Sequence, residues 1–461
     1  MKSSLVLVCA LWTVASTSES SDDAGSGGTA GNGYCGGETP SAGEISGEDP
    51  EATVPWDWNG VVGTGQSLAV GQNGTPVRST TQPYGNLKLD TGTALWPLDP
   101  EDESFSLVPL IEPIGRRSTA YPSAYPTNIA GETPHAAMAN QISALVEGVS
   151  DAEHVGVHGE YGENGQCMTY LKKGATENGV NGRAYAATLL ETEVIARLAE
   201  AEGKSYGVGA VIVTHGECDA GNSSYDDDLY QLWSDYNTDL AAITGQDRDL
   251  LMIVSQQNAV SHRAASTLAQ WRVGVEHPDE VVCSGPKYQY QYSSDGIHLN
   301  VDGYQALGEK YGQVYYQRVV LGENWQPLQP TLVERTGARG IRVDFHVPVP
   351  PLVWDAELDA PLQGIEEWKS GKGFELRGPG GRMAIHYVEI CDSSVFIESA
   401  EDLPESGVFI GYALTGQAEA MVAPHAGTFR WGLLRDSDPF VGSSTGVAQP
   451  NYSVAFELAV P

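Results

Sequence analysis

Ser67 lies in the stretch GTGQSLAVG (residues 63–71), directly after the apolar pair Val61 and Val62. A serine among small residues after an apolar run is typical of the turn between a strand and a helix. Its hydroxyl can act as a nucleophile when a base removes the proton and a further group orients that base. The stretch alone favours an ordinary turn serine over a nucleophile, so a base must be sought elsewhere.

The segment SSDGIHLNVDGY (residues 293–304) offers such a base. Asp295 and His298 are three residues apart, just before a helical pattern. In a loop or a single turn, this spacing can bring a carboxylate against one imidazole nitrogen and leave the other nitrogen free as a base. An isolated Asp-x-x-His is more often a turn-capping aspartate beside a surface histidine.

Two further segments carry polar residues that a parallel sheet could bring near the serine. VIVTHGECDA (residues 211–220) is an apolar strand pattern that ends in polar residues beginning with His215. AGETPHAAMANQISALV (residues 130–146) places Gly131 before a helix whose first N–H groups could receive negative charge. Each segment is a weak signal alone, because strand ends and helix starts often carry such residues.

Charge is strongly unbalanced along this chain of 461 residues. It has 25 Lys and Arg against 60 Asp and Glu, which gives a formal net charge of −35. Such a surface repels phosphate backbones and anionic lipid, so the composition argues against nucleic-acid binding. High negative charge also maintains solubility in saline surroundings, which suits an exported protein.

The N-terminus has the pattern of an export signal. Lys2 is followed by the apolar segment LVLVCALWTVA (residues 5–15) and then by small residues. We therefore predict a signal peptide over residues 1–16 and a secreted or cell-surface location. Val8 before Cys9 has the wrong size for a lipoprotein signal, which argues against a lipid anchor. The segment is too short to span a bilayer, and the sequence offers no other candidate span.

The cysteines allow a disulfide but indicate no metal site. They are Cys9, Cys35, Cys167, Cys218, Cys283 and Cys391. The five cysteines after the signal cannot all pair within one chain. One disulfide among Cys167, Cys218 and Cys283 is compatible with an oxidising compartment, but the sequence does not choose it. No CxxC or Cys/His ligand spacing is present, so we expect neither a metal nor a cofactor.

The chain divides into three regions after the signal. Residues 17–53 are rich in Gly, Ser and acids and predict a disordered linker. Residues 54–325 alternate strand and helix patterns, which predicts an α/β domain with a parallel sheet covered on both faces. Residues 326–461 contain short β-branched and aromatic runs between Gly, Pro and Asp, and predict a smaller all-β sandwich module. The clearest patterns in residues 54–325 are strands at 154–160, 208–216 and 249–257 and helices at 183–203, 227–245 and 301–322.

Three of these motifs together resemble the SGNH hydrolases. They are GQS at residues 65–67, HGE with an Asp two residues later after a middle strand, and DGIHLNVDGY before the last helix. The likeness is strongest to the carbohydrate-esterase branches, of the sialate O-acetylesterase and acetylxylan esterase types. It covers about residues 54–322, and it implies a flavodoxin-like three-layer domain.

The resemblance also implies roles for individual residues. Ser67 corresponds to the nucleophile, His298 to the general base and Asp295 to the residue that orients the base. Gly131 matches the block whose backbone N–H joins that of Ser67 in the oxyanion hole. The third block has Gly-x-Asn-Asp or Gln-Gly-Glu-Ser in the family, whereas this chain has HGEC from His215 onward. No asparagine is available there, so His215 is a candidate third donor through a ring N–H, and the glutamate is expected to tie loops together.

Other motifs fit the serine less well. The α/β-hydrolase elbow is Gly-x-Ser-x-Gly, but Ala69 stands in place of its second glycine. Leu68 stands where a dinucleotide fingerprint needs glycine, and the stretch lacks the lysine of a phosphate loop.

The hypothesis from sequence is a secreted serine esterase that removes acyl groups, with O-acetyl groups expected, from carbohydrate or another small acyl ester. A lipolytic or thioester-cleaving member of the same superfamily is an alternative, although no apolar lid segment is evident. A catalytically decayed protein that binds glycan is a third, because the third block departs from the family. Trp354, Trp368 and Trp431 of the β module could stack on sugars or pack in its core.

Overall fold

The computed structural model describes residues 51–92, 94, 98–115, 131–175, 183–259, 261–416 and 429–461. These residues belong to one compact unit. The predicted signal peptide and nearly all of the predicted linker lie outside them. Within the described part of the chain, no helix combines the length and apolar character that a membrane crossing requires.

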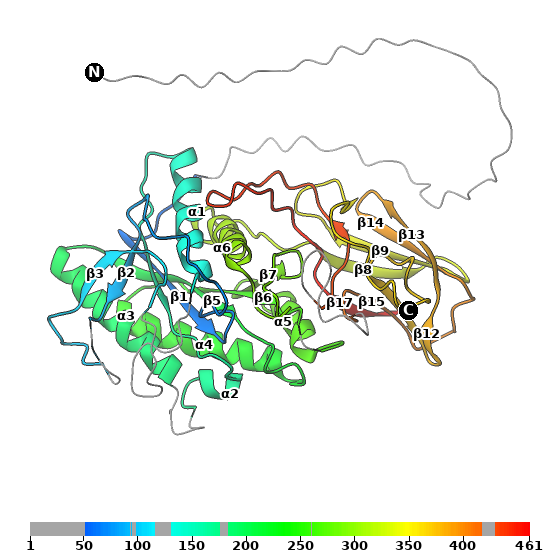
Figure 1. Cartoon of the computed structure of the whole chain (residues 1–461), viewed down its shortest axis with the longest axis horizontal. Helices are drawn as coiled ribbons and strands as arrows, with labels where there is room; N and C mark the ends of the chain where they lie inside the picture. The colour runs from blue at the N-terminus through cyan, green and yellow to red at the C-terminus, as the bar shows by residue number, and fades with distance from the viewer. Residues whose placement is uncertain are drawn as a thin grey trace, which may run out of the picture. The chain divides into compact units, whose positions relative to one another are not determined.

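Seven strands form one sheet in the order β3-β2-β4-β1-β5-β6-β7 (Figure 1). Neighbouring strands run parallel, except that β3 pairs antiparallel with β2. The sheet is therefore dominated by parallel pairs, as the sequence predicts, while its antiparallel edge is not predicted. The strands are β1 (Trp58–Gly65), β2 (Leu87–Asp90), β3 (Ser106–Pro109), β4 (Gly156–Glu160), β5 (Tyr206–Thr214), β6 (Leu251–Gln256) and β7 (Val281–Pro286).

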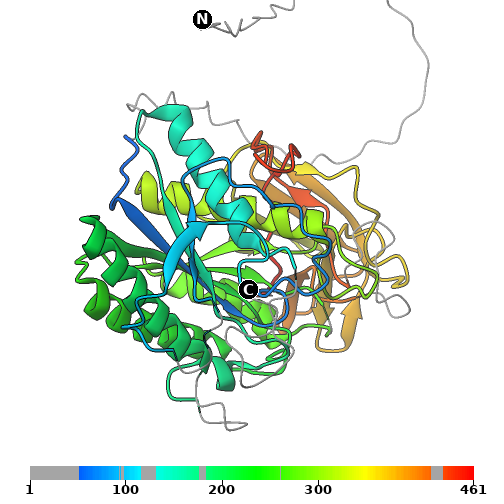
Figure 2. The same ribbon diagram turned by 60° about the vertical axis from the view of Figure 1, so that its left-hand side comes forward.

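Helices cover both faces of this sheet (Figure 2). The first and the last of them, α1 and α6, pack together on one face, and α3, α4 and α5 pack side by side on the other. Gly203 after α3 and Gly245 after α4 adopt φ values of 67° and 71°, so both predicted glycine stops are present. The helices are α1 (Pro134–Val149), α2 (Met168–Leu171), α3 (Arg183–Glu202), α4 (Tyr225–Thr244), α5 (Ala265–Glu276) and α6 (Val301–Tyr315), with a π-helical turn η2 (Tyr316–Val320) after α6.

Both helices of the α1–α6 face start with a cap encoded in the sequence. The Thr133 side chain accepts a hydrogen bond from the backbone N–H of His135, and Pro134 occupies the first position of α1. The Asn300 side chain accepts from the N–H of Gly303 at 2.9 Å and so starts α6. These caps fix where the two helices begin, directly after the Gly131 and His298 segments.

After η2 the chain is built from antiparallel strands. Two four-stranded sheets have the orders β12-β11-β15-β17 and β13-β14-β9-β8, and β10 pairs with β16. Aromatic rings from the two four-stranded sheets lie close together: the ring centroids of Phe345 on β9 and Phe456 on β17 are 6.1 Å apart. The strands are β8 (Gln329–Arg335), β9 (Gly340–His346), β10 (Val353–Trp354), β11 (Phe374–Gly378), β12 (Gly381–Met383), β13 (Ile385–Cys391), β14 (Ser394–Ser399), β15 (Val408–Tyr412), β16 (Leu434–Arg435) and β17 (Phe456–Val460).

This β-rich region, residues 329–461, shares its core with the α/β region. One hydrophobic cluster extends from the face covered by α3, α4 and α5 into the antiparallel sheets. At the junction, the Trp271 ring of α5 lies 6.2 Å from the Phe456 ring, and its Nε1–H donates to Gln329 Oε1 at 2.8 Å. The two regions therefore bury apolar surface against each other.

The tryptophans of the β-rich region serve its core. Trp368 and Trp431 are buried, and their Nε1–H groups donate to the carbonyls of Leu376 and Asp359. Trp354 is half-buried beneath the Lys372 ammonium, which lies 4.4 Å from the ring centroid. Of the two roles that the sequence left open for Trp368 and Trp431, the structure shows packing in the core and not stacking on sugars, because both side chains are buried.

Candidate active site

The segment that carries Ser67 leaves the sheet at Gly65, the last residue of β1. Gly65 has a φ of 142°, and a Cβ there would lie 2.2 Å from the carbonyl oxygen of Thr214 on β5. Only glycine fits this contact. The Gln66 N–H donates to the same carbonyl at 3.3 Å, and Ser67 follows at the carboxyl end of the sheet.

Residues 66–74 form a compact turn, held by backbone hydrogen bonds such as Gln72 N–H to the Ser67 carbonyl at 3.0 Å. This turn packs against the segment before α1. The Glu132 N–H donates to the Gly74 carbonyl at 2.7 Å, and a Cβ at Gly131 would lie 2.3 Å from that same oxygen. The structure thus brings the predicted oxyanion glycine, Gly131, into backbone contact with the turn of Ser67.

Asp295 and His298 form an ion pair in the loop before α6. His298 Nδ1 lies 2.6 Å from Asp295 Oδ2. The other carboxylate oxygen accepts from the Ser293 hydroxyl at 2.8 Å and from the N–H groups of Ile297 and His298, both at 2.9 Å. Partial burial raises the pKa of Asp295, but the hydrogen bonds, led by that of His298, outweigh it and lower the pKa to about 2. Asp295 is therefore ionised at neutral pH, and its carboxylate holds the Nδ1 side of the imidazole.

Asn73 joins the turn of Ser67 to the loop of Asp295. Its Nδ2 donates to Asp295 Oδ2 at 2.8 Å and to Ser293 Oγ at 3.1 Å. Nearby, the Tyr304 hydroxyl of α6 donates to the Gln72 carbonyl at 2.7 Å. These bonds hold the two predicted catalytic segments side by side. No direct hydrogen bond between Ser67 and His298 is present among the described residues.

Sequence reasoning missed Asn73. The only signal is the Asn-Gly pair at residues 73 and 74, which indicates a turn. Asn73 has a φ of 67°, in the left-handed region that asparagine tolerates better than most residues. Its contact with Asp295 spans 222 positions of the chain, and local sequence patterns do not indicate contacts over that distance.

His215 is fully buried at the end of β5, next to the turn of Ser67. Its Nδ1 lies 2.6 Å from the Tyr225 hydroxyl, and its Nε2 lies 3.0 Å from the Gln166 carbonyl. Burial lowers the pKa of His215, which favours the neutral ring. A neutral ring has one N–H, and the Gln166 carbonyl takes it. His215 therefore has no free donor for an oxyanion in this arrangement, contrary to what the sequence suggested.

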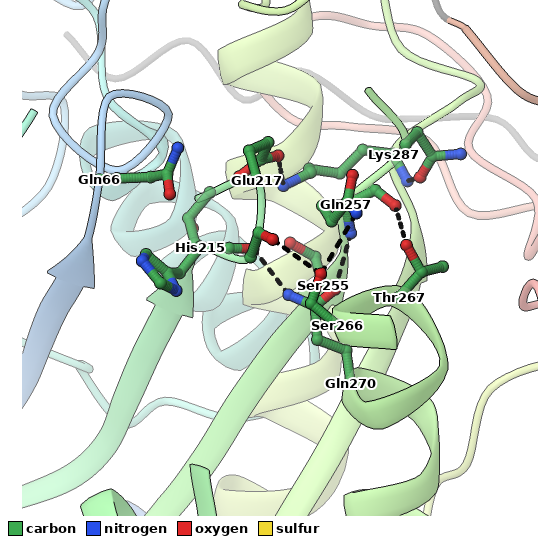
Figure 3. A network of polar contacts seen from close by, with 12 residues as sticks. Gln66, His215, Glu217, Ser255, Gln257, Ser266, Thr267, Gln270 and Lys287 are labelled. Atoms are coloured by element: carbon green, nitrogen blue, oxygen red, sulfur yellow. Dashed lines mark hydrogen bonds and ion pairs between the residues drawn. The ribbon is translucent and has the colours of Figure 1, made fainter. Parts of the chain in front are cut away.

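The remainder of the third block is held by side chains from neighbouring strands. Glu217 pairs with the buried Lys287 at 3.1 Å, which ties the end of β5 to the segment after β7 (Figure 3). The Cys218 N–H donates to Gln66 Oε1 at 3.1 Å, directly beside Ser67. Glu217 thus ties loops together, as expected from the sequence, and Gln66 links this block to the turn of Ser67.

A disulfide joins Cys167 before α2 to Cys218, with Cα atoms 5.1 Å apart. Cys283 on β7 is buried with a free thiol. The structure thereby selects one of the pairings that the sequence left open. In the part of the chain that the structure describes, no group of three or more His, Cys, Asp and Glu residues could hold a metal ion.

No protein-family model and no curated protein sequence matches this chain. Solved structures do match it. The carbohydrate acetylesterase XAC1771 from Xanthomonas citri is similar over 87% of this chain and 80% of its own, with 11% sequence identity and a TM-score of 0.53. The fold is carbohydrate-esterase-like. The matched share of this chain is larger than the α/β region, so the likeness extends into the β-rich region.

Two further solved structures each match a smaller share of this chain than XAC1771 does. A protein from Arabidopsis thaliana matches 57% of this chain and 100% of its own, with 16% identity and a TM-score of 0.43. A carbohydrate acetylesterase family member from Sinorhizobium meliloti matches 57% and 99%, with 14% identity and a TM-score of 0.30.

Proposed function

We propose that this protein is a serine esterase of the SGNH type that hydrolyses O-acyl esters, foremost O-acetyl esters, on carbohydrate. The observation that carries the proposal is the Asp295–His298 pair at 2.6 Å, in a loop that Asn73 ties to the turn of Ser67. The carbohydrate-esterase-like fold supports the substrate class. An acidic exported protein that acts on acetylated polysaccharide fits the charge and the N-terminal signal predicted from sequence.

In the proposed reaction, the Ser67 hydroxyl attacks the acyl carbonyl while His298 takes its proton through Nε2. Asp295 holds Nδ1 and stabilises the imidazolium that forms. Collapse of the tetrahedral intermediate breaks the ester bond, and His298 returns the proton to the departing sugar oxygen. Water then attacks the acyl-Ser67 intermediate with His298 again as base, which releases the carboxylic acid and restores the serine.

We assign the oxyanion hole to the backbone N–H groups of Ser67 and Gly131. The backbone contact between the Gly131 segment and the turn of Ser67 supports this pair of donors. His215 is not retained as a third donor, because its ring nitrogens already have partners. Each donor in such a hole contributes about 3 kcal/mol to transition-state stabilisation.

The test compares acetate release by the wild-type protein and by Ser67→Ala. We expect wild-type turnover of acetylated xylan, pectin or sialic acid, or of a chromogenic acetate ester, and a fall in kcat of about 10⁴-fold or more in the variant. Ser205→Ala is a suitable control, because Ser205 bonds to Asp57 at the opposite end of β5 and should leave kcat unchanged. Equal turnover by Ser67→Ala would exclude Ser67 from the mechanism.

The same assay separates the alternatives. Faster turnover of long-chain esters or thioesters than of acetate would instead assign a lipolytic or thioester-cleaving activity. Retention on glycan without turnover of any ester would indicate a binding protein and contradict the proposal.

A further inference from the structure

Arg430 belongs to the β-rich region by sequence, but its side chain bonds to residues of the α/β region. Its Nη2 donates to the Gln257 carbonyl and to the Thr267 hydroxyl, both at 2.9 Å, and its Nε donates to the Asn258 carbonyl at 3.3 Å. The Asn258 amide donates in return to the Arg430 carbonyl at 3.2 Å. Arg430 is fully buried, and although burial lowers its pKa to about 10, the guanidinium keeps its charge at neutral pH.

The residues that Arg430 contacts hold the third block of the site. Gln257 Nε2 donates to Ser266 Oγ at 3.2 Å, and Ser266 Oγ donates to the Gly216 carbonyl at 2.7 Å (Figure 3). In parallel, the Gln257 N–H donates to Gln270 Oε1 at 2.8 Å, and Gln270 Nε2 donates to the His215 carbonyl at 2.7 Å. The carbonyls of His215 and Gly216 are thus each held by a side chain of α5. Both of these side chains, Gln270 and Ser266, also bond to Gln257.

The third block in turn fixes the residue before the nucleophile. The Cys218 N–H donates to Gln66 Oε1 at 3.1 Å, and the Gln66 N–H donates to the Thr214 carbonyl. A shift of residues 215–218 would therefore move Gln66 and, with it, the backbone N–H of Ser67. A displacement of about 1 Å at a catalytic group can lower a rate by about 100-fold.

We propose that Arg430 is a positioning residue of the esterase, through which the β-rich region completes the active site. The guanidinium holds Gln257, Gln257 orients Ser266 and Gln270, and these two fix the backbone of residues 215–218 beside the turn of Ser67. The role rests on the proposed function and extends it to a residue more than 350 positions from the nucleophile in sequence. A planar fork with several donors serves three oxygen acceptors at once, which a lysine ammonium on a flexible stem does not reproduce.

The experiment compares Arg430→Lys and Arg430→Met with the wild-type protein. We expect a fall in kcat of about tenfold or more for an acetate ester in both variants, with KM within about twofold, because the acyl-transfer step rather than substrate binding is disturbed. Arg335→Lys and Arg335→Met are matched controls. Among the described residues, Arg335 donates to the carbonyls of Leu403 and Pro404, inside the β-rich region, and its variants should retain the wild-type kcat.

Hydrogen exchange of the full-length proteins supplies a readout that is independent of activity. In Arg430→Lys, amide protection should fall locally in residues 211–220 and not across the sheet. Unchanged kcat with unchanged exchange would overturn the proposal, as would a loss of protection spread evenly over the α/β region or an equal loss of activity in Arg335→Lys. If the wild-type protein hydrolyses no ester, the proposed function fails, while the exchange pattern still decides whether Arg430 positions residues 215–218. If Arg430→Met does not fold, Arg430→Lys carries the comparison.

Discussion

Asn73 couples the turn of Ser67 to the loop of Asp295, the two segments that the proposed reaction needs close together. Its amide holds Asp295 and Ser293, and its φ of 67° is accessible to glycine and asparagine without strain. We therefore predict that Asn73→Gly keeps the turn but lowers kcat for an acetate ester by about tenfold or more, because Asp295 and His298 lose their tether to the turn of Ser67. Steady-state kinetics would show this.

Asn73→Asp sharpens the same test, because it places a carboxylate against Asp295. Like charges at this distance raise the pKa of both groups, so the acid limb of the activity profile should move to higher pH than in Asn73→Gly. Wild-type kcat in Asn73→Gly, or superposable pH profiles for the two variants, would contradict the coupling.

The buried carboxyl of Glu112 leads to a prediction about the stability of the protein. Burial and the nearby charge of Glu132 raise the pKa of Glu112 to about 8, so the folded protein keeps this carboxyl protonated at neutral pH. Its ordinary value is 4.5. Between these two values the unfolded chain has lost the proton and the folded chain has not, so stability falls as pH rises from about 4.5 through about 8.

In the wild-type protein, the Ile114 N–H and the Thr133 hydroxyl both donate to the Glu112 carboxyl. The variant Glu112→Gln has no titrating group at this position and keeps one oxygen that can accept from either donor. We predict that its Tm exceeds that of the wild-type protein by at least about 2 °C at pH 8, with a smaller difference at pH 5. Thermal unfolding over this pH range, with the exposed Glu101→Gln as control, checks the prediction. A difference that does not change with pH would contradict it.

Sequence patterns identified residues that could do chemistry and missed those that hold them. The three-residue spacing of Asp295 and His298 allowed their contact, because the two residues are close in the chain. Asn73 and Arg430 reach partners 222 and 173 positions away, and such contacts leave no periodic signal. His215 was suggested as a donor from its place in the block where related sequences carry an asparagine. The direction of its ring depends on Tyr225 and Gln166, which that block does not contain.

Among the elements, the end of β1 is the one on which the site depends most directly. Gly65 has no room for a side chain next to the Thr214 carbonyl, so Gly65→Ala must push β1 and β5 apart where the turn of Ser67 begins. We predict a loss of kcat of about tenfold or more, together with a lower Tm. Gly148→Ala on α1 is the matched control, because a Cβ there meets no atom within 4 Å and alanine favours a helix. Wild-type kcat in a folded Gly65→Ala protein would show that the turn tolerates the shift.

The elements that the sequence revealed are those with long periodic patterns or clear end signals. Both α3 and α4 run for 20 residues and stop at a glycine, and the predicted bounds agree with the structure to within a few residues. By contrast, α5 starts after Ala264, which provides no side-chain cap, and β2 and β3 have four residues each. The last helix is predicted to run to residue 322, but it changes to a π-helical turn at Tyr316.

At the scale of the whole molecule, polar side chains of α6 reach into the β-rich region. The Glu309 carboxylate accepts from the N–H groups of Ser444 and Thr445, and Lys310 Nζ donates to the Gln449 carbonyl at 2.9 Å and to Asn451 Oδ1 at 3.0 Å. Both side chains are buried. Since each loses hydration in the folded state, both depend on these partners from the β-rich region.

Two consequences follow for unfolding. Because the apolar cluster and these buried bonds span both regions, we predict that the full chain unfolds in one calorimetric transition, with the same midpoint by circular dichroism and by tryptophan fluorescence.

A chain that ends at residue 325 should be insoluble or lack protected amides, because it exposes the Trp271 face of α5 and leaves Glu309 and Lys310 without their partners from the β-rich region. Two separate transitions, or a soluble truncated protein with the activity of the full chain, would mean that the β-rich region folds and acts independently. Such a result would also remove the structural basis for any contribution of Arg430 to the site.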